Sequence, residues 1–206
     1  FKKEYRVEFF RYGMPLFFLL TVGWLLNNAD RFIVLEFFNL ESVAMYVAAY
    51  QIGISVNLIN QSITNGIVPI IYKSINDKKD TISLVNRYLK NFSIFYFFIA
   101  IGIYIAFPII IPIIFGSQYL DSIDISILIA LAFVFNGLYR IPSLVIDFFK
   151  KNMLKVWITA VAALLNIILS ILFIDSYGLL APAYGTAFSY IFLAIVVYFC
   201  SKRLLS

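Results

Sequence analysis

Residues 91–115, NFSIFYFFIAIGIYIAFPIIIPIIF, carry no charge and decide the fold class of this 206-residue chain. A helix of about 20 apolar residues is long enough to cross a bilayer. The whole chain is also apolar, because 63% of its residues are hydrophobic and only 13% are charged. A soluble fold of this size cannot hide so much apolar surface from water. The composition therefore predicts a membrane protein and excludes a soluble enzyme and a disordered chain.

Six apolar segments are long enough to cross a membrane as helices. We expect them at residues 13–38, 41–72, 90–115, 121–149, 153–174 and 179–200. The second is too long for one straight crossing, so we expect it to tilt, to bend near Gly66 and Pro69, or to project into the cytoplasm. The sequence thus predicts an all-α integral membrane protein, with six transmembrane helices in a single unit over residues 1–206.

Basic residues alternate between the predicted loops. Fourteen of the 16 Lys and Arg residues fall before the first helix or after the second, fourth and sixth. They are Lys2, Lys3, Arg6, Arg11, Lys73, Lys78, Lys79, Arg87, Lys90, Lys150, Lys151, Lys155, Lys202 and Arg203. The other three loops hold only the acidic residues Glu41, Asp121, Asp124 and Asp175. Because Lys and Arg are enriched in cytoplasmic loops, we expect a multi-pass protein of the cell (inner/plasma) membrane with both ends of this segment in the cytoplasm.

The residues that the chain lacks exclude several chemistries. There is no His and one Cys, Cys200, which excludes an internal disulfide, a His/Cys zinc site and a His-based triad. No Gly-rich phosphate loop and no hydrolytic pair of carboxylates is present, so we expect no enzyme, no cofactor and no metal site. The basic residues flank apolar runs instead of forming one patch, which argues against nucleic-acid binding. Because the chain begins with Phe1, we expect it to be part of a longer protein.

Two charged residues lie inside the first predicted helix. Asp30 and Arg31 follow Asn27, and the three share one helical face. Helix rise places Asp30 about 24 Å from the cytoplasmic end, in the outer third of the membrane. Charges at this depth are costly and often functional. Two interpretations stay open: a pair that anchors the outer end of the helix, or a role with a substrate or an ion.

The fourth predicted helix has one polar face in its inner half. Asn136, Arg140, Ser143 and Asp147 recur there every three or four residues. Arg140 lies about 25 Å from the outer end, so a direct pair with Asp30 is not expected. It either reaches the inner headgroups or faces a water-filled cavity and binds an anionic phosphate.

Amide side chains extend this polar inner half to other helices. The amides at or below mid-depth are Asn57, Asn60, Gln61, Asn136 and Asn166. Each amide alone fits a role in holding helices together. Taken together with Arg140, they predict a cavity that opens to the cytoplasm. The small residues Ala181, Gly185 and Ser189 predict only close helix packing.

Several short motifs resemble those of one family of membrane transporters. They are YGMP at 12–15, LLNNADRFI at 25–33, SVAMYVAAY at 42–50, IFGSQY at 114–119, Asn166, and YGLLAPA at 177–183. In order and spacing they are similar to the second half of Wzx-type polysaccharide flippases of the multidrug/oligosaccharidyl-lipid/polysaccharide (MOP) superfamily, which also contains the MATE-like exporters. Val43-Ala44 and Ala181-Pro182 depart from the usual Val-Gly and Gly-Ala of these motifs.

The resemblance implies two six-helix lobes, of which this chain would be the C-terminal one, with the N-terminal lobe outside it. It implies a flippase that moves a polyprenyl-pyrophosphate-linked oligosaccharide across the membrane by alternating access, for surface polysaccharide (lipopolysaccharide O-antigen) biosynthesis. The implied partners are this lipid-linked oligosaccharide, membrane lipids, the missing lobe and a polysaccharide polymerase. Arg31 and Arg140 would contact the pyrophosphate or sugar acids, and Asp30 would orient Arg31 or couple an ion.

Three other functions stay open from the sequence. A cation-coupled multidrug or metabolite exporter of the same superfamily would place carboxylates at depth, whereas this chain sets Asp30 against two arginines. A membrane assembly subunit without transport of its own would have no hydrated polar face. A glycosyltransferase or polymerase would need a larger outer loop than any predicted here.

Overall fold

The computed structural model describes residues 3–206, with the side chains of residues 3–9, 11, 12, 115, 117 and 118 left out. The side chains of Lys2, Lys3, Arg6 and Arg11, which form the predicted N-terminal basic group, therefore lie outside the described part. The side chains of Tyr12 in the YGMP motif and of Ser117 and Gln118 in the IFGSQY motif also lie outside the described part.

Helices make up 94% of the chain, and residues 3–206 contain no strand. The long helices are α1 (Lys3–Phe37), α2 (Leu40–Gly53), α3 (Ser55–Ser74), α4 (Lys78–Phe115), α5 (Ile123–Phe148), α6 (Asn152–Tyr177) and α7 (Ala181–Leu205). Two 3-10 turns, η1 (Ser117–Ser122) and η2 (Gly178–Leu180), connect them. The all-α prediction is confirmed.

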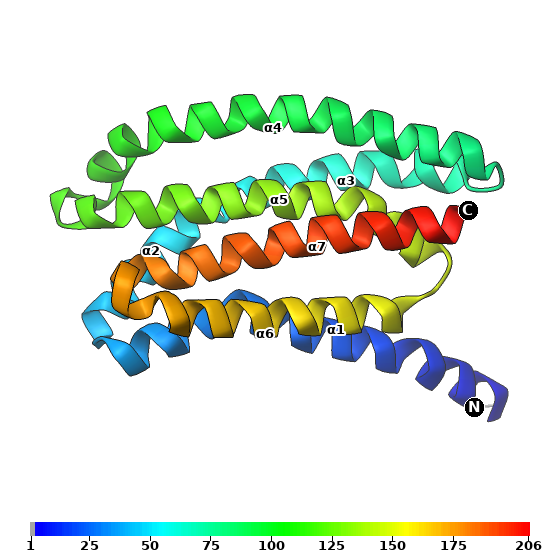
Figure 1. Ribbon diagram of the computed structural model, residues 1–206, viewed down its shortest axis with the longest axis horizontal. Coiled ribbons are helices and arrows are strands. Elements are labelled where there is room, and N and C mark those ends of the chain that lie inside the picture. Colours follow the sequence, from blue (N-terminus) through cyan, green and yellow to red (C-terminus); the bar gives the residue numbers. More distant parts are fainter. Residues whose placement is uncertain (1–2) are drawn as a thin grey trace.

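Five helical segments are long and apolar enough to cross a membrane. They are Gly13–Phe37, Leu40–Ser74, Lys78–Ile114, Tyr119–Phe148 and Asn152–Leu205. The last spans 54 residues and contains both α6 and α7, which reverse direction at η2 (Figure 1). Gly178 allows this reversal because its φ of +54° is one that other residues rarely adopt. The chain is a multi-pass membrane protein, and six crossings remain a prediction.

The second predicted helix is interrupted at a different place from the one expected. α2 ends at Gly53 and α3 begins at Ser55, whereas Gly66 and Pro69 lie within the continuous α3. The interruption thus lies before Gly66 and Pro69, and a bend at these two residues was one of three expectations. Proline is tolerated inside membrane helices because neighbouring groups satisfy the backbone that it frees.

Close packing against α5 coincides with the observed interruption. A Cβ at Gly53 would lie 2.6 Å from Ile129 Cγ2 and 3.0 Å from the backbone nitrogen of Ala130. The backbone stays bonded through the break, because the Ile54 N–H donates to the Tyr50 carbonyl at 2.8 Å.

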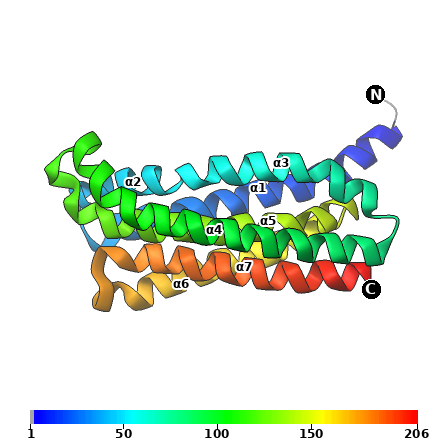
Figure 2. The same cartoon turned by 90° about the horizontal axis from the view of Figure 1, so that it is seen from above.

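Helices α5 and α7 form the centre of the bundle. α5 packs on α2, α3, α4 and α7, while α7 also packs on α6, which in turn packs on α1. Figure 2 shows α1, α2 and α3 on one side of the molecule and α6 and α7 on the other. Aromatic rings fill the middle of the core: Phe133 of α5 contacts Tyr50 of α2 and Tyr190 of α7, with ring centroids 5.9 and 5.6 Å apart.

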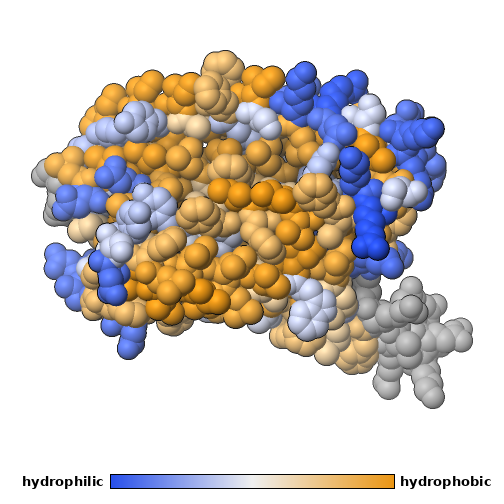
Figure 3. All heavy atoms as spheres, viewed as in Figure 1, coloured by the Kyte–Doolittle hydropathy of each residue, from blue (hydrophilic) through white to orange (hydrophobic). Residues whose placement is uncertain are grey.

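Charged residues gather at the two ends of an apolar surface (Figure 3). The end that holds both chain termini carries Lys73, Lys79, Lys150 and Lys202, and we name it the basic end. The opposite end carries Glu41, Asp121, Asp124 and Asp175, and we name it the acidic end.

Candidate functional site

Two clusters of polar side chains lie inside the bundle. The Asp30 cluster joins α1, α2, α6 and α7, and its members are Asp30, Tyr46, Asn166, Ser170 and Thr186. The Arg140 cluster lies nearer the basic end, joins α3, α4 and α5, and consists of Asn57, Asn60, Tyr96, Asn136 and Arg140. Helical spacing aligns several members, since residues three or four apart share a face.

Asp30 is completely buried, with 0% of its surface exposed. Its Oδ2 accepts hydrogen bonds from the Tyr46 hydroxyl of α2 and the Thr186 hydroxyl of α7, each at 2.8 Å. Its Oδ1 accepts none from the described residues. Burying a charge is costly unless it is bonded or paired, and Oδ1 is a buried acceptor without a described partner.

Asn166 extends this cluster from α7 to α6 and α1. Its Nδ2 donates to Thr186 Oγ1 at 3.0 Å and to the Leu26 carbonyl at 3.2 Å. The Ser170 hydroxyl donates to the Asn166 carbonyl at 2.7 Å. The expectation that Asn166 joins the inner amides is wrong, because depth counted along one helix does not say which neighbouring helix a side chain faces.

Gly185 lets α6 and α7 approach at this point. A Cβ there would overlap the Ser170 hydroxyl and would lie 2.8 Å from the Asn166 carbonyl. The predicted packing role of the stripe that contains Gly185 is thus confirmed at this position, and the close approach brings Thr186 to Asn166.

The Asp30 cluster combines one carboxylate with neutral hydroxyl and amide groups. A single buried negative charge is best balanced by a proton or a monovalent cation. Among the described residues no group of three or more His, Cys, Asp and Glu could hold a metal ion. Ionisable groups inside membrane segments commonly mark ion pathways.

Arg31 makes contacts that differ from the expected ones. Its Nη1 donates to the side-chain oxygen Oδ1 of Asn28, and its guanidinium carbon lies 5.3 Å from the centre of the Tyr50 ring. Its Nε is buried and has no hydrogen-bond partner in the described part. Arg31 directly follows Asp30 in the chain, but its hydrogen-bond partner is Asn28 and not Asp30.

Arg140 is held by two neutral amides. Its Nη2 donates to Asn57 Oδ1 of α3 at 2.9 Å, and its Nε donates to Asn136 Oδ1 at 3.0 Å. The side chain is half-buried. Neutral acceptors orient the guanidinium without cancelling its charge, so a positive potential remains at this point of the bundle.

Asn60 and Tyr96 lock α3 and α4 onto α5. Asn60 Nδ2 donates to the Phe133 carbonyl at 2.7 Å, and the Tyr96 hydroxyl donates to Asn60 Oδ1. Gly137 provides the space, since a Cβ at this position would overlap the Tyr96 hydroxyl. Asn60 is fully buried and its amide is occupied by these contacts, so the structure gives it a helix-packing role.

Asn27 of α1 and two tyrosines, of α2 and α7, form a further group of polar contacts. Asn27 Oδ1 accepts from the Tyr50 hydroxyl at 3.1 Å and from the Tyr190 hydroxyl at 2.7 Å. These hydrogen bonds tie α1 to α2 and α7 beside the two clusters, and Asp30 and Arg140 do not pair directly in the described part.

The polar face of α5 continues to the basic end. The Ser143 hydroxyl donates to the Arg140 carbonyl at 2.8 Å, and Asp147 pairs with Lys155 at the start of α6 at 2.8 Å. This is the one ion pair among the described residues, and its Lys side chain is only 9% exposed. It ties α5 to α6 beside the turn that joins them.

The predicted site residues fall into three groups. Asp30, Asn60, Asn136 and Asn166 are buried; Arg31, Asn57 and Arg140 are half-buried; Gln61 is exposed on α3. A single hydrated face shared by all the amides is therefore wrong, because Asn60 and Asn166 are enclosed by neighbouring helices. Substrate contact by the half-buried residues and by Gln61 remains a prediction.

Sequence reasoning missed three members of these networks, Tyr96, Thr186 and Tyr190. Thr186 and Tyr190 are four residues apart, so they project from one face of an apolar helix. That spacing could have indicated a polar face on this helix. The neighbouring small residues Ala181, Gly185 and Ser189 indicated only close helix packing.

Together the fold and the two clusters define an α-helical, multi-pass membrane protein with bonded charges inside its bundle. A comparison with known families matches residues 1–124 to the family described as polysaccharide biosynthesis protein. The match covers more than half of the chain, and the chain belongs to this family. It includes Asp30, Arg31, Asn57 and Asn60, whereas Arg140 lies beyond it. No curated protein and no solved structure matches the chain.

Proposed function

We propose that this chain is one lobe of a flippase that moves a polyprenyl-pyrophosphate-linked oligosaccharide across the cell membrane for surface polysaccharide biosynthesis. The family supports a role in polysaccharide biosynthesis as a membrane transporter rather than an enzyme. In the proposal, alternating access takes place between this lobe and a second one.

The positive charge of Arg140 is the observation that supports an anionic substrate. It is the guanidinium held only by neutral amides described above, and the lone ion pair of the described part lies elsewhere, between Asp147 and Lys155. An exporter of cationic compounds would be hindered by this positive charge. A pyrophosphate offers the oxygens that guanidinium groups bind best.

Asp30 is proposed as the coupling site. Its unbonded Oδ1 and the hydroxyls of Tyr46 and Thr186 offer oxygen atoms to a proton or a monovalent cation. Asp30 itself contacts Tyr46 of α2 and Thr186 of α7. Occupancy of Asp30 can thereby bias the packing of α1, α2 and α7 around the substrate site.

Arg140→Gln in the chromosomal gene tests the proposal. Glutamine keeps an amide that can bond Asn57 but removes the positive charge. We expect the protein to insert normally while export of the surface polysaccharide falls at least about tenfold, as for the loss of one charged ligand contact. Arg87→Gln is the matched control, because Arg87 is exposed on α4.

Protein amounts are compared by immunoblot, and surface glycan is measured together with lipid-linked repeat units that accumulate in the inner leaflet. Full export by Arg140→Gln at normal protein levels would contradict a role in substrate binding. Loss of glycan without accumulation of lipid-linked units would favour an assembly role instead of transport.

A further inference from the structure

A groove of about 460 Å³ lies between α4 and α7, with α5 as its floor. Its lining residues are Asn86, Leu89, Ser93, Phe135, Leu138, Ile191, Ala194, Ile195, Tyr198 and Phe199. Seven of these are apolar, and the volume falls within the range of about 300–1,000 Å³ typical of small-molecule sites.

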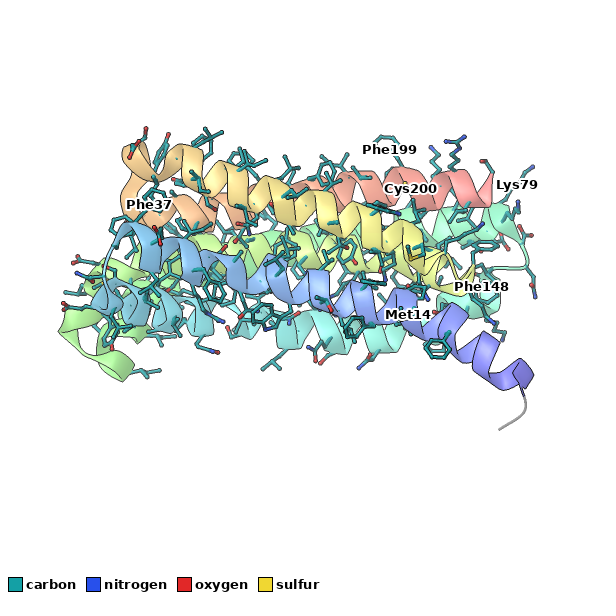
Figure 4. The ribbon with its side chains drawn as sticks, turned by 90° about the horizontal axis from the view of Figure 1, so that it is seen from below. Met14, Phe37, Lys79, Phe148, Phe199 and Cys200 are labelled. Atoms are coloured by element: carbon teal, nitrogen blue, oxygen red, sulfur yellow. The ribbon has the colours of Figure 1, made fainter. Side chains whose placement is uncertain are left out.

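The groove lies on a different side of α5 from the Arg140 cluster. Leu138 lines the groove, and Arg140 follows two residues later, which is a rotation of about 200° around the helix. Figure 1 shows α5 between α4 and α7 on the near face of the molecule. Figure 4 places Phe199 of α7 at the opposite edge from Met14 of α1, so the groove is remote from α1.

One end of the groove is polar and faces the basic end of the bundle. There the Tyr198 hydroxyl donates to Asn86 Oδ1 at 3.1 Å, bridging α7 and α4. Asn86 lies about 12 Å along α4 from its start, a depth near the boundary between headgroups and hydrocarbon.

Basic residues flank this polar end on both walls. Lys202 is one turn from Tyr198 towards the basic end, whereas Lys90 is one turn from Asn86 in the opposite direction, between the groove residues Leu89 and Ser93. Both lysines are exposed. Arg87 and Arg203 are also exposed beside them. The acidic residues on this stretch of α4 are Asp77, which caps its first turn, and Asp80.

We propose that this groove binds an acyl chain of an anionic membrane phospholipid, with the headgroup held between Lys90 and Lys202. The apolar walls suit an acyl chain, and they open towards lipid between exposed side chains such as Ile195 and Phe199. Long basic side chains reach headgroups while their stems cover apolar surface, and juxtamembrane cations attract anionic lipids.

Such a lipid fills the space where α4 and α7 diverge and holds α4 in place. The site is separate from the proposed substrate site, so its test does not depend on transport.

Native mass spectrometry of the detergent-purified protein measures the binding. The probes are phosphatidylglycerol and phosphatidylcholine with identical acyl chains. We expect at least about a fivefold preference for phosphatidylglycerol. Joint replacement Lys90→Gln and Lys202→Gln should abolish the preference, whereas Lys73→Gln with Lys151→Gln, at the same end but away from the groove, should preserve it.

Ala194→Phe fills the groove with a ring and should lower phosphatidylglycerol binding at least about fivefold. Ala44→Phe, at an exposed position of α2, is the matched control. Undiminished binding by a folded Ala194→Phe variant, or equal binding of the two lipids by the unmodified protein, would overturn the proposal.

A third measurement needs no variant. Phosphatidylglycerol with a photoreactive acyl chain is incorporated into vesicles with the protein, and labelled residues are mapped by mass spectrometry. We expect labelling of the groove residues Phe135, Leu138 and Ala194 to exceed that of Phe97 and Ile105, exposed residues of α4 that do not line the groove. Uniform labelling of all exposed apolar residues would mean a non-specific lipid shell and would also overturn the proposal.

Discussion

Asp30 and Arg31 are neighbours in the chain but have separate partners. The carboxylate bonds to hydroxyls of α2 and α7, while the guanidinium bonds to Asn28 and lies over Tyr50. Successive helical residues point about 100° apart, so adjacency in the sequence does not make an ion pair. The consequence is a buried negative charge whose second oxygen has no described partner.

Asp30→Asn should keep the fold and remove ligand-dependent stability. The amide oxygen can still accept from Tyr46 and Thr186, but the negative charge is lost. If Asp30 binds sodium or a proton, unfolding of the unmodified protein depends on that ion, and a ligand at ten times its Kd adds about 1.4 kcal/mol. The measurement is the Tm in detergent over a sodium series and a pH series.

Glu36→Gln is the control for this experiment, because Glu36 is exposed on the same helix. It should retain the ion dependence of the unmodified protein. A Tm that responds identically to sodium and pH in Asp30→Asn and in the unmodified protein would rule out Asp30 as the coupling site.

At the scale of an element, the boundary between α2 and α3 depends on contact with another helix. Glycine and proline at 66 and 69 are the stronger local signals for a break, yet α3 runs through both. Gly53 lies against Ile129 of α5, and the helix is interrupted there. A long-range contact therefore outweighs the local preference of the backbone.

Gly53→Ala should destabilise the protein by about 1–3 kcal/mol, because the added methyl group overpacks the contact with α5. Gly66→Ala is the matched control on the same predicted helix, since nothing lies within 4 Å of its Cβ position. This control should be neutral or more stable by up to about 1 kcal/mol. Thermal unfolding in detergent compares the two, and equal Tm values would contradict close packing at Gly53.

For the whole molecule, the distribution of charge accounts for the arrangement of the bundle. Each apolar helix needs lipid around it and water at its ends, and the lysines whose side chains the structure describes gather at one of those ends. By the positive-inside rule we expect that end to face the cytoplasm. The reversal at Gly178 then returns α7 to the side on which α6 began.

Single cysteines in a Cys200→Ser background test this topology. We expect Glu41→Cys and Ser176→Cys, at exposed sites of the acidic end, to react with an impermeant maleimide on intact cells. Asn76→Cys and Lys151→Cys, at exposed sites of the basic end, should react only after the membrane is opened. Reaction of Lys151→Cys and Ser176→Cys under the same conditions would show that α6 does not cross the membrane.

The sequence by itself determined the membrane class, the helical content and most of the polar residues of the two clusters. These follow from composition and from helical periodicity, which act over a few residues along one segment. It also determined that charges separate to the two ends, because loop residues sit where their helices end.

Only the tertiary structure decided which polar groups meet. In the structure Asn166 belongs to the Asp30 cluster, Asn60 is buried, and Arg31 bonds to Asn28. Tyr96, Thr186 and Tyr190 complete the hydrogen-bond networks. The physical reason is that helix rotation and crossing are set by side-chain packing between segments far apart in the chain. Glycines such as Gly137 and Gly185 show their effect only when a second helix lies against them.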